Sequence, residues 1–509
     1  MIKGLYSILF LLIFQIGFSQ TEIDKKAIKL VEKSDEAVAD RDFQKARDLL
    51  NEALKRDSSY AKTYERLFTV LRILQKRDQI YQLQLRYVKN VNERFLNNQI
   101  WQSLASYEFS KGNYDEASKF MSEVQKKDSV LYESIQFSLE QISEPKEFEV
   151  TLLPPQINKL TFQYLPVLTI DGRTMIFTGL PGNGSDEDIY TSQFEGGDWS
   201  EATPISDTIN TPYNEGACSI SADGRTLIFT ACEGRPTFGN CDLYLTQKTG
   251  DTWSTPKNLG EAVNSRHWDS QPSLSADGKT LYFVSNRPGG IGGRDIWITQ
   301  FDGDKWSTPR NPGRPINTRH DETTPFIYAN NRTLFFSSNG HVGLGGFDLF
   351  KAEFENGKWV KIKNLGFPIN TFNDEVSLFV TSSGDQAFFT KEESRNGKTY
   401  KSEIASYLIP KEKPFVPSVS YITGKVKDAT TGQPLDAKIE LVDLTNRGKT
   451  YSTESDPSTG KYFLVLPSSL NFGMFVERAG YLPQDISLST SQLESSDTVD
   501  FQLQPLIEG

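Results

Sequence analysis

The chain has 509 residues, enough for about three domains at roughly 150 residues each. Lys and Arg number 55 against 66 Asp and Glu, and this net charge of −11 disfavours nucleic acid as a partner, because binding a phosphate backbone requires a basic face. With only three His and three Cys, the chain lacks the ligands of a His-rich metal site or a four-cysteine zinc site, so we expect neither a metal nor another cofactor.

Residues 1–19 have the pattern of a secretory signal peptide. Lys3 supplies the positive charge, a short apolar run follows, and the small residues Gly17 and Ser19 precede the expected cleavage before Gln20. The run is too short for a membrane-spanning helix, and no later segment reaches about 18 apolar residues. We therefore expect an exported mature chain without a transmembrane segment.

Residues 22–144 are predicted to form an all-α domain, because they contain no Pro and one Gly and carry apolar residues at helical spacing. Two stretches, 41–60 and 112–131, align with each other, and each has an aromatic residue followed three positions later by Ala. The pattern resembles the tetratricopeptide repeat, and we predict about three repeats. Such repeats bind a peptide or a partner's helix, or they only space domains apart; the sequence leaves both roles open.

Residues 147–409 carry a longer repeat. The turn and strand SADGRTLIFT at 221–230 recurs at 275–284, with weaker copies at 169–178, 328–337 and 381–390. Asp-Gly turns between alternating apolar runs predict hairpins, and four short strands about every 53 residues predict the blades of an all-β propeller. We predict five blades, and the alternative is six if a degenerate unit lies in 405–420. Four of the copies also carry a tryptophan and an aspartate at fixed positions, and we expect both to have a structural role. These residues are Trp199, Trp253, Trp306, Trp359, Asp188, Asp242, Asp295 and Asp348.

The propeller segment resembles the WD40-like repeats of the TolB-type Pro-Asp family, with the Asp-Gly-Arg/Lys turn ahead of an apolar strand at 222–229 and 276–283. The run 152–158 aligns with the outermost strand of other copies, whereas the fifth copy ends without one. We expect this run to complete the last blade and so to close the ring.

One polar residue precedes the innermost strand of each blade, and we expect the five to surround one mouth of the central channel. Such a ring could hold a cation or a basic side chain of a partner. The structural alternative is that each residue caps backbone N–H groups at the entry of its own strand. The candidate ring consists of Gln163, Glu215, Asp269, Glu322 and Glu375.

Export places the cysteines in an oxidising compartment. Cys232 and Cys241 flank a Gly-containing loop and are predicted to form a disulfide, which leaves Cys218 free; the alternative is three buried thiols. The Gly-rich loops 286–295 and 339–348 lie between strands, which excludes a phosphate cradle at a strand-to-helix junction. We identify no catalytic residues and expect no enzymatic activity.

A Pro-rich linker, 410–418, precedes a small all-β sandwich predicted at 419–505. The segments TGKVKDATTGQPLDAKIELVD and TGKYFLVLP resemble the carboxypeptidase regulatory-like, transthyretin-like domain, which carries no catalytic zinc. The name implies no peptidase activity here.

The order of these domains resembles that of exported envelope proteins of Bacteroidota with OmpA-family architecture, some of them linked with type IX secretion and gliding. The sequence stops at Gly509, where the OmpA-like domain usually begins, so we expect either a member that acts through partners alone or a fragment of a longer chain. The resemblance implies a non-enzymatic scaffold in the periplasm, peripherally associated with the outer membrane, that binds envelope or outer-membrane proteins. The alternative is a propeller that captures a glycan, a peptidoglycan fragment or a cation at its channel mouth.

Overall fold

The computed structural model describes most of the chain, and the predicted signal peptide lies outside the described residues. The chain divides into two compact units, Met1–Glu108 with Glu116–Lys127, and Phe109–Asp115 with Asp128–Gly509. The described residues are 23–91, 96–125, 129–144, 149–181, 186–395, 398–444, 450–466, 471–489 and 496–506.

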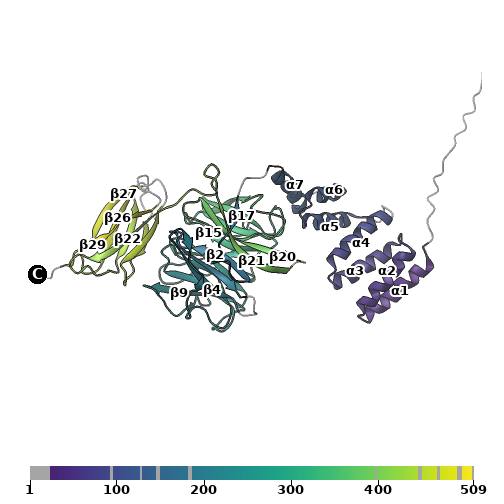
Figure 1. Ribbon diagram of the computed structural model, residues 1–509, viewed down its shortest axis with the longest axis horizontal. Helices are drawn as coiled ribbons and strands as arrows, with labels where there is room; N and C mark the ends of the chain where they lie inside the picture. The colour runs from purple at the N-terminus through teal and green to yellow at the C-terminus, as the bar shows by residue number, and fades with distance from the viewer. Residues whose placement is uncertain are drawn as a thin grey trace, which may run out of the picture. The chain divides into compact units, whose positions relative to one another are not determined.

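The helices of the described residues all precede the sheets (Figure 1). Asp24 and Asp42 start the first two helices, because their side chains accept hydrogen bonds from free backbone N–H groups of the first turn. The helices are α1 (Lys25–Ala39), α2 (Phe43–Arg56), α3 (Ala61–Ile73), α4 (Arg77–Asn90), α5 (Asn98–Phe109), α6 (Tyr114–Ser122) and α7 (Val130–Ser143). Among the described residues, none of them is long and apolar enough to cross a membrane.

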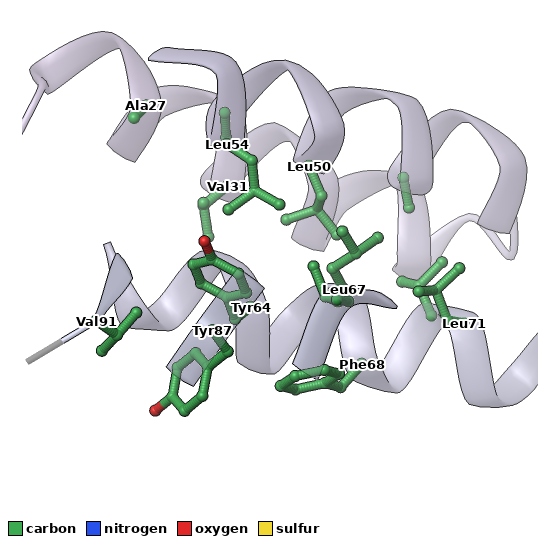
Figure 2. Packing of buried hydrophobic residues seen from close by; sticks show 14 of the residues in the cluster. Ala27, Val31, Leu50, Leu54, Tyr64, Leu67, Phe68, Leu71, Tyr87 and Val91 are labelled. Atoms are coloured by element: carbon green, nitrogen blue, oxygen red, sulfur yellow. The ribbon is translucent and has the colours of Figure 1, made fainter. Parts of the chain in front are cut away.

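The predicted fold class is wrong in its all-α part. The described residues hold seven helices of 9 to 15 residues and no extensive array of tetratricopeptide repeats; strands follow from Val150 onward. Small residues at helix contacts recur in the two aligned stretches, as Ala46 and Ala117, whereas α3 and α4 pack through Tyr64 and Tyr87, whose ring centroids are 5.1 Å apart. Figure 2 shows these large side chains filling the space between the helices. Large residues at these contacts keep the helices from repeating one close-packed pair.

Five groups of antiparallel strands follow, and we number them as blades in chain order; blades 1 and 5 are joined by a short parallel pairing of Phe162 in β2 with Ser402 in β21. Each innermost strand contacts the innermost strand of the next blade, and that of blade 5 contacts that of blade 1, so the sheets form a closed ring. This arrangement is a β-propeller. Blade 1 contains β2 (Phe162–Leu168), β3 (Thr174–Leu180), β4 (Asp188–Glu195), β5 (Asp198–Trp199) and β6 (Thr203–Pro204); blade 2 contains β7 (Glu215–Ile220), β8 (Thr226–Ala231), β9 (Asp242–Thr249), β10 (Thr252–Trp253) and β11 (Lys257–Asn258). Blade 3 contains β12 (Asp269–Leu274), β13 (Thr280–Ser285) and β14 (Asp295–Gln300); blade 4 contains β15 (Glu322–Ile327), β16 (Thr333–Ser338), β17 (Asp348–Glu355) and β18 (Lys358–Asn364); blade 5 contains β19 (Val376–Val380), β20 (Gln386–Arg395), β21 (Lys398–Leu408) and β1 (Val150–Leu152).

Strand β1 precedes blade 1 in the chain and belongs to blade 5 in space. It pairs antiparallel with β21, and Val150 lies opposite Tyr407. The side chain of Asn158 extends this closure, because its amide donates to the carbonyl of Ile404 and accepts from the N–H of the same residue. Residues from both ends of the propeller therefore build one sheet.

The last domain is a sandwich of two four-stranded sheets whose inner faces carry buried Ile439, Leu441, Phe472 and Met474. The linker before it packs on the propeller, where the hydroxyl of Tyr328 donates to the carbonyl of Pro417 at 3.0 Å. One sheet contains β22 (Ser420–Asp428), β25 (Lys461–Leu466), β28 (Ser496–Thr498) and β29 (Phe501–Leu503); the other contains β23 (Lys438–Asp443), β24 (Thr450–Glu454), β26 (Asn471–Glu477) and β27 (Gln484–Ser489).

Candidate functional site

The five residues of the candidate ring occupy equivalent places in the blades, and all five are buried. Each of the four carboxylates accepts hydrogen bonds from the backbone N–H and the hydroxyl of a Ser or Thr four residues earlier. For Glu322 the N–H of Thr318 lies at 2.7 Å. Gln163 instead donates to the carbonyl of Ser402. The buried ring residues are Gln163, Glu215, Asp269, Glu322 and Glu375.

This placement differs from the expected open mouth of a channel. The carboxylate oxygens are directed at the chain's own N–H and O–H groups, which is the geometry of a cap at a strand entry. No group of three or more His, Cys, Asp or Glu side chains suited to a metal ion occurs in the described part of the chain. The ring residues therefore hold the blade entries together and are not open to a glycan or a free cation.

Two of these carboxylates have a cation beside them. Arg235 lies 3.4 Å from Glu215, and Arg287 lies 2.6 Å from Asp269. Each guanidinium also donates to a carbonyl of the preceding segment and lies over aromatic rings of its own blade. In blade 4, His341 is within hydrogen-bond distance of the equivalent carbonyl, at 3.0 Å, between Phe336 and Phe350. Burial lowers the pKa of His341, so the cation of blades 2 and 3 is replaced by a neutral ring in blade 4 at neutral pH.

The carboxylates of blades 4 and 5, Glu322 and Glu375, carry no ion pair among the described residues, and their pKa values are raised. Burial raises the pKa of Glu322. Burial raises the pKa of Glu375 to about 7. The pKa of Asp348 lies well above its ordinary value, because that side chain is buried and faces the charge of Glu375. Blades 4 and 5 therefore hold two neighbouring buried carboxyl groups, Asp348 and Glu375, whose pKa values are both raised.

The channel itself is lined by a different ring, which the sequence reasoning missed. One residue in each innermost strand has a positive φ, between 43° and 58°, at a β-bulge. In four of the five bulges the N–H donates to a side-chain oxygen of the preceding blade, as in the 2.9 Å bond from Ala217 to Thr178. The bulge residues are Leu165, Ala217, Gln271, Thr324 and Ser377.

These bulges surround a small cavity of about 70 Å³. Ligand pockets measure roughly 300–1,000 Å³, so this space suits a few water molecules and not a sugar. Two of the four acceptors, Thr178 and Thr390, are hydroxyl residues in the second strand of a blade, and the other two, Gln271 and Thr324, are bulge residues of the preceding blade. The hydroxyl ring links neighbouring blades and is part of the propeller's structure.

The repeated aspartates fold the hairpin loops that precede them. Asp242, Asp295 and Asp348 each accept a hydrogen bond from the backbone N–H four residues earlier, at 2.7, 2.5 and 2.7 Å. The Oδ1 atoms of Asp188 and Asp348 have no hydrogen-bond partner in the described part of the chain. The repeated tryptophans Trp199, Trp306 and Trp359 each pack against a phenylalanine of the preceding strand, with ring centroids 5.1 to 5.2 Å apart, and Lys248 lies over Trp253.

The loops folded by these aspartates present equivalent apolar tips. Phe238 in blade 2 and Ile291 in blade 3 are 47% and 38% exposed, whereas Leu344 in blade 4 is fully buried. Leu344 is buried because α7 and Tyr114 lie on its loop: the hydroxyl of Tyr114 donates to the carbonyl of Leu344 at 2.8 Å, and Ser134 of α7 accepts from the N–H of Gly343. The glycines of these loops stand out in the sequence, whereas the exposed apolar side chains at their tips were not predicted.

The loop of blade 2 contains the predicted cysteine pair. The structure places Cys232 and Cys241 in a disulfide at the base of this loop, and Cys218 is a buried free thiol in β7. Burial raises the pKa of Cys218 to about 12, so its thiol is protonated and unreactive at neutral pH. The cross-link leaves Phe238 at the tip of a loop with a fixed base.

No family model and no curated protein matches the chain. Solved structures that match it include an α-L-arabinofuranosidase from Lactobacillus brevis, with 12% identity over 52% of this chain and 97% of that chain at a TM-score of 0.37. A thermostable family-43 glycoside hydrolase matches with 14% identity over 53% of this chain and 97% of that chain at a TM-score of 0.36. Hydrazine synthase of Kuenenia stuttgartiensis matches with 12% identity over 68% of this chain at a TM-score of 0.34, and the match spans 63% of that chain.

These structures correct the expectation that the chain is not an enzyme. Two of the three are glycoside hydrolases, so the absence of a recognised catalytic motif in the sequence was too weak a reason to exclude enzymes. Their identities and TM-scores are too low to transfer an activity, a substrate or a catalytic residue to this chain. What the structure establishes is the propeller fold.

Proposed function

We propose that this chain is an exported scaffold of the bacterial cell envelope whose propeller binds protein partners through the loops that carry Phe238 and Ile291. One observation carries the proposal: the equivalent loop of blade 4 already holds helix α7, through the bond from the N–H of Gly343 to Ser134, and its tip accepts a second bond from the hydroxyl of Tyr114. The two other tips expose large apolar side chains on loops of fixed geometry, which is the character of a protein-binding surface.

The setting of the proposal rests on the pattern of the sequence. The signal-peptide pattern at residues 1–19 supports export. The domain order resembles that of OmpA-family envelope proteins of Bacteroidota, which supports a place in the periplasm beside the outer membrane and a role in a type IX secretion or gliding-related assembly.

Cross-linking in intact host cells tests this function. The tagged chain is cross-linked and captured, and mass spectrometry maps each link to a residue. We expect reproducible links from residues 232–241 and 286–295 to envelope proteins, and a loss of these links in a double variant, Phe238→Asp with Ile291→Asp. The matched control is Leu482→Asp, because Leu482 is equally exposed, at 51%, and lies in the sandwich. Propeller links that persist unchanged in the double variant would contradict the proposal.

A second candidate function is favoured by a cleft. The turns of blades 2 to 4 and the sandwich enclose a space of about 1020 Å³ lined by Asp277, Asn331, Arg332 and Tyr451. Polar groups beside an aromatic ring are suited to a glycan or a peptidoglycan fragment. Titration calorimetry of the chain with soluble peptidoglycan fragments tests this function; binding that is weakened by Tyr451→Ala is expected, and no heat of binding refutes it.

A further inference from the structure

The loops of blades 3 and 4 share the segment Gly-aliphatic-Gly-Gly, at 290–293 and 343–346, followed one residue later by an Asp. In both, an Asp accepts from the N–H of the apolar tip and from the N–H of the glycine after it. In both, the residue before the tip must be glycine, because a Cβ on Gly290 or Gly343 would lie 1.9 or 1.7 Å from that Asp. The tips of the two loops are therefore held by their Asp in the same way.

Helix α7 shows what such a loop binds. Ser134 accepts a hydrogen bond from the N–H of Gly343 at 3.1 Å, and Ser138, one helical turn later, lies 3.4 Å from the carbonyl of the same glycine. Ile135, beside Ser134, is fully buried. Small hydroxyl residues at positions i and i+4 share one face of the helix, so the helix approaches the loop closely while the peptide group of Gly343 keeps hydrogen-bond partners.

The loop of blade 3 has no such cover. Ile291 is exposed, and no described residue forms a hydrogen bond with the peptide groups of Gly290. Arg294 and Arg319 are exposed close by: Arg294 follows the loop directly, and the turn that contains Arg319 reaches the loop through the bond from the N–H of Gly293 to the carbonyl of His320. The segments next to the tip thus carry two exposed arginines, of which Arg294 places its guanidinium over the ring of Trp268, and one acidic neighbour, Asp321, which accepts from the N–H of Arg294.

We infer that the loop of blade 3 binds an acidic helix of a partner protein that carries two small hydroxyl residues four positions apart, with an aliphatic side chain beside the first. The inference rests on the proposed function and names the chemistry of the partner. The hydroxyls bind the peptide group of Gly290, the aliphatic side chain covers Ile291, and acidic residues face Arg294 and Arg319. Helix α7 itself has this composition, with Glu133 and Glu140.

A helix-stabilised peptide with the sequence of residues 130–143 is the probe, because isolated helices of this length are marginal in water. Its binding to the full chain is measured by fluorescence anisotropy. We expect saturable binding that Ile291→Asp weakens by about tenfold or more and Leu482→Asp leaves unchanged. A peptide with both serines replaced by alanine should bind about fivefold or more weakly. Arg294→Glu with Arg319→Glu should weaken binding and reverse its salt dependence, because salt then screens a repulsion between acidic groups.

Equal affinity of the peptide for wild type and Ile291→Asp would overturn the inference, as would the absence of binding. The peptide can exchange with α7 on blade 4, and such binding is insensitive to Ile291→Asp, so it counts against the inference. Failure here is distinguishable from failure of the proposed function. If cells still yield cross-links from residues 232–241 to envelope proteins while the peptide does not bind blade 3, the partner chemistry is wrong and the scaffold function stands.

Discussion

Replacement of Glu375 by Gln tests whether the buried carboxyl groups of blades 4 and 5 hold a proton in the folded chain. The pKa of Glu375 is raised by burial to about 7, against an ordinary value of 4.5. Between these values the folded chain binds a proton that the unfolded chain has released, so the free energy of unfolding falls as pH rises through this window. The stabilisation is fully present below pH 4.5 and is lost by about pH 8.

The size of the effect follows from the same pKa. At about 1.36 kcal/mol for each pH unit between 4.5 and 7, Glu375 contributes a loss of about 3 kcal/mol. Asp348 adds to the loss in the same direction, because its pKa is also raised by burial and by the charge of Glu375. Glu375→Gln keeps an oxygen that can accept from the N–H of Thr371 and cannot ionise, so the variant should be more stable than wild type at pH 8.

Urea unfolding between pH 5 and pH 8.5 measures this effect. Six of the seven tryptophans lie in residues 147–409, so tryptophan fluorescence follows the propeller. The midpoint of wild type should fall with pH, and that of Glu375→Gln should fall much less. Glu261→Gln is the matched control, because Glu261 is exposed. If wild type and Glu375→Gln lose stability equally between pH 5 and pH 8, the assignment of a buried proton to this pair is refuted.

Three further substitutions have expected costs that urea unfolding can check. Arg287→Ala leaves the carboxylate of Asp269 buried without its cation and should cost roughly 3–5 kcal/mol, against little for the exposed Arg266→Ala. Thr390→Val removes the acceptor of the N–H of Leu165 and should cost about 1–3 kcal/mol; an equal effect of the exposed Thr252→Val would contradict the role of the hydroxyl ring. Replacing Cys232 and Cys241 by Ala opens a loop of sequence separation 9 and should cost about 2–3 kcal/mol, and an unchanged midpoint would show that the cross-link does not stabilise the chain.

The propeller could be predicted from the sequence because its signals are local. Gly172, Gly224 and Gly278 follow an Asp in three hairpin turns and have φ values of 68° to 72°, which is why the turn residues recur with the period of the blades. The helical segment was overestimated because the repeat was inferred from two stretches. Between them, Tyr64 and Tyr87 take up the volume that small residues would leave free, and this difference concerns packing and not periodicity.

The orientation of the candidate ring could not be predicted, because the direction of a side chain along a strand depends on its register. The bulges at Leu165, Ala217 and their equivalents add one residue to each innermost strand, and the bulge residues themselves share no residue type, although Thr178 and Thr390 accept from two of them. The buried tip at Leu344 was equally hidden. Its loop looks like that of Ile291 in the sequence, and only the contact with α7, about 200 residues earlier in the chain, distinguishes them.

Strand β1 closes the ring of the propeller by pairing with β21, and this pairing forms last. Val150 pairs with Tyr407, so in a chain synthesised from its N-terminus β1 has no partner strand until β21 of blade 5 has been made. During this time the unpaired edges of β1 are free to pair with other chains. In a circular permutant that begins at β2 and carries β1 after β21, these two strands are neighbours in the chain. Their long-range pairing, the slowest loop closure, then becomes the pairing of a hairpin. We expect the permutant to refold faster than the natural order, with the same sheets.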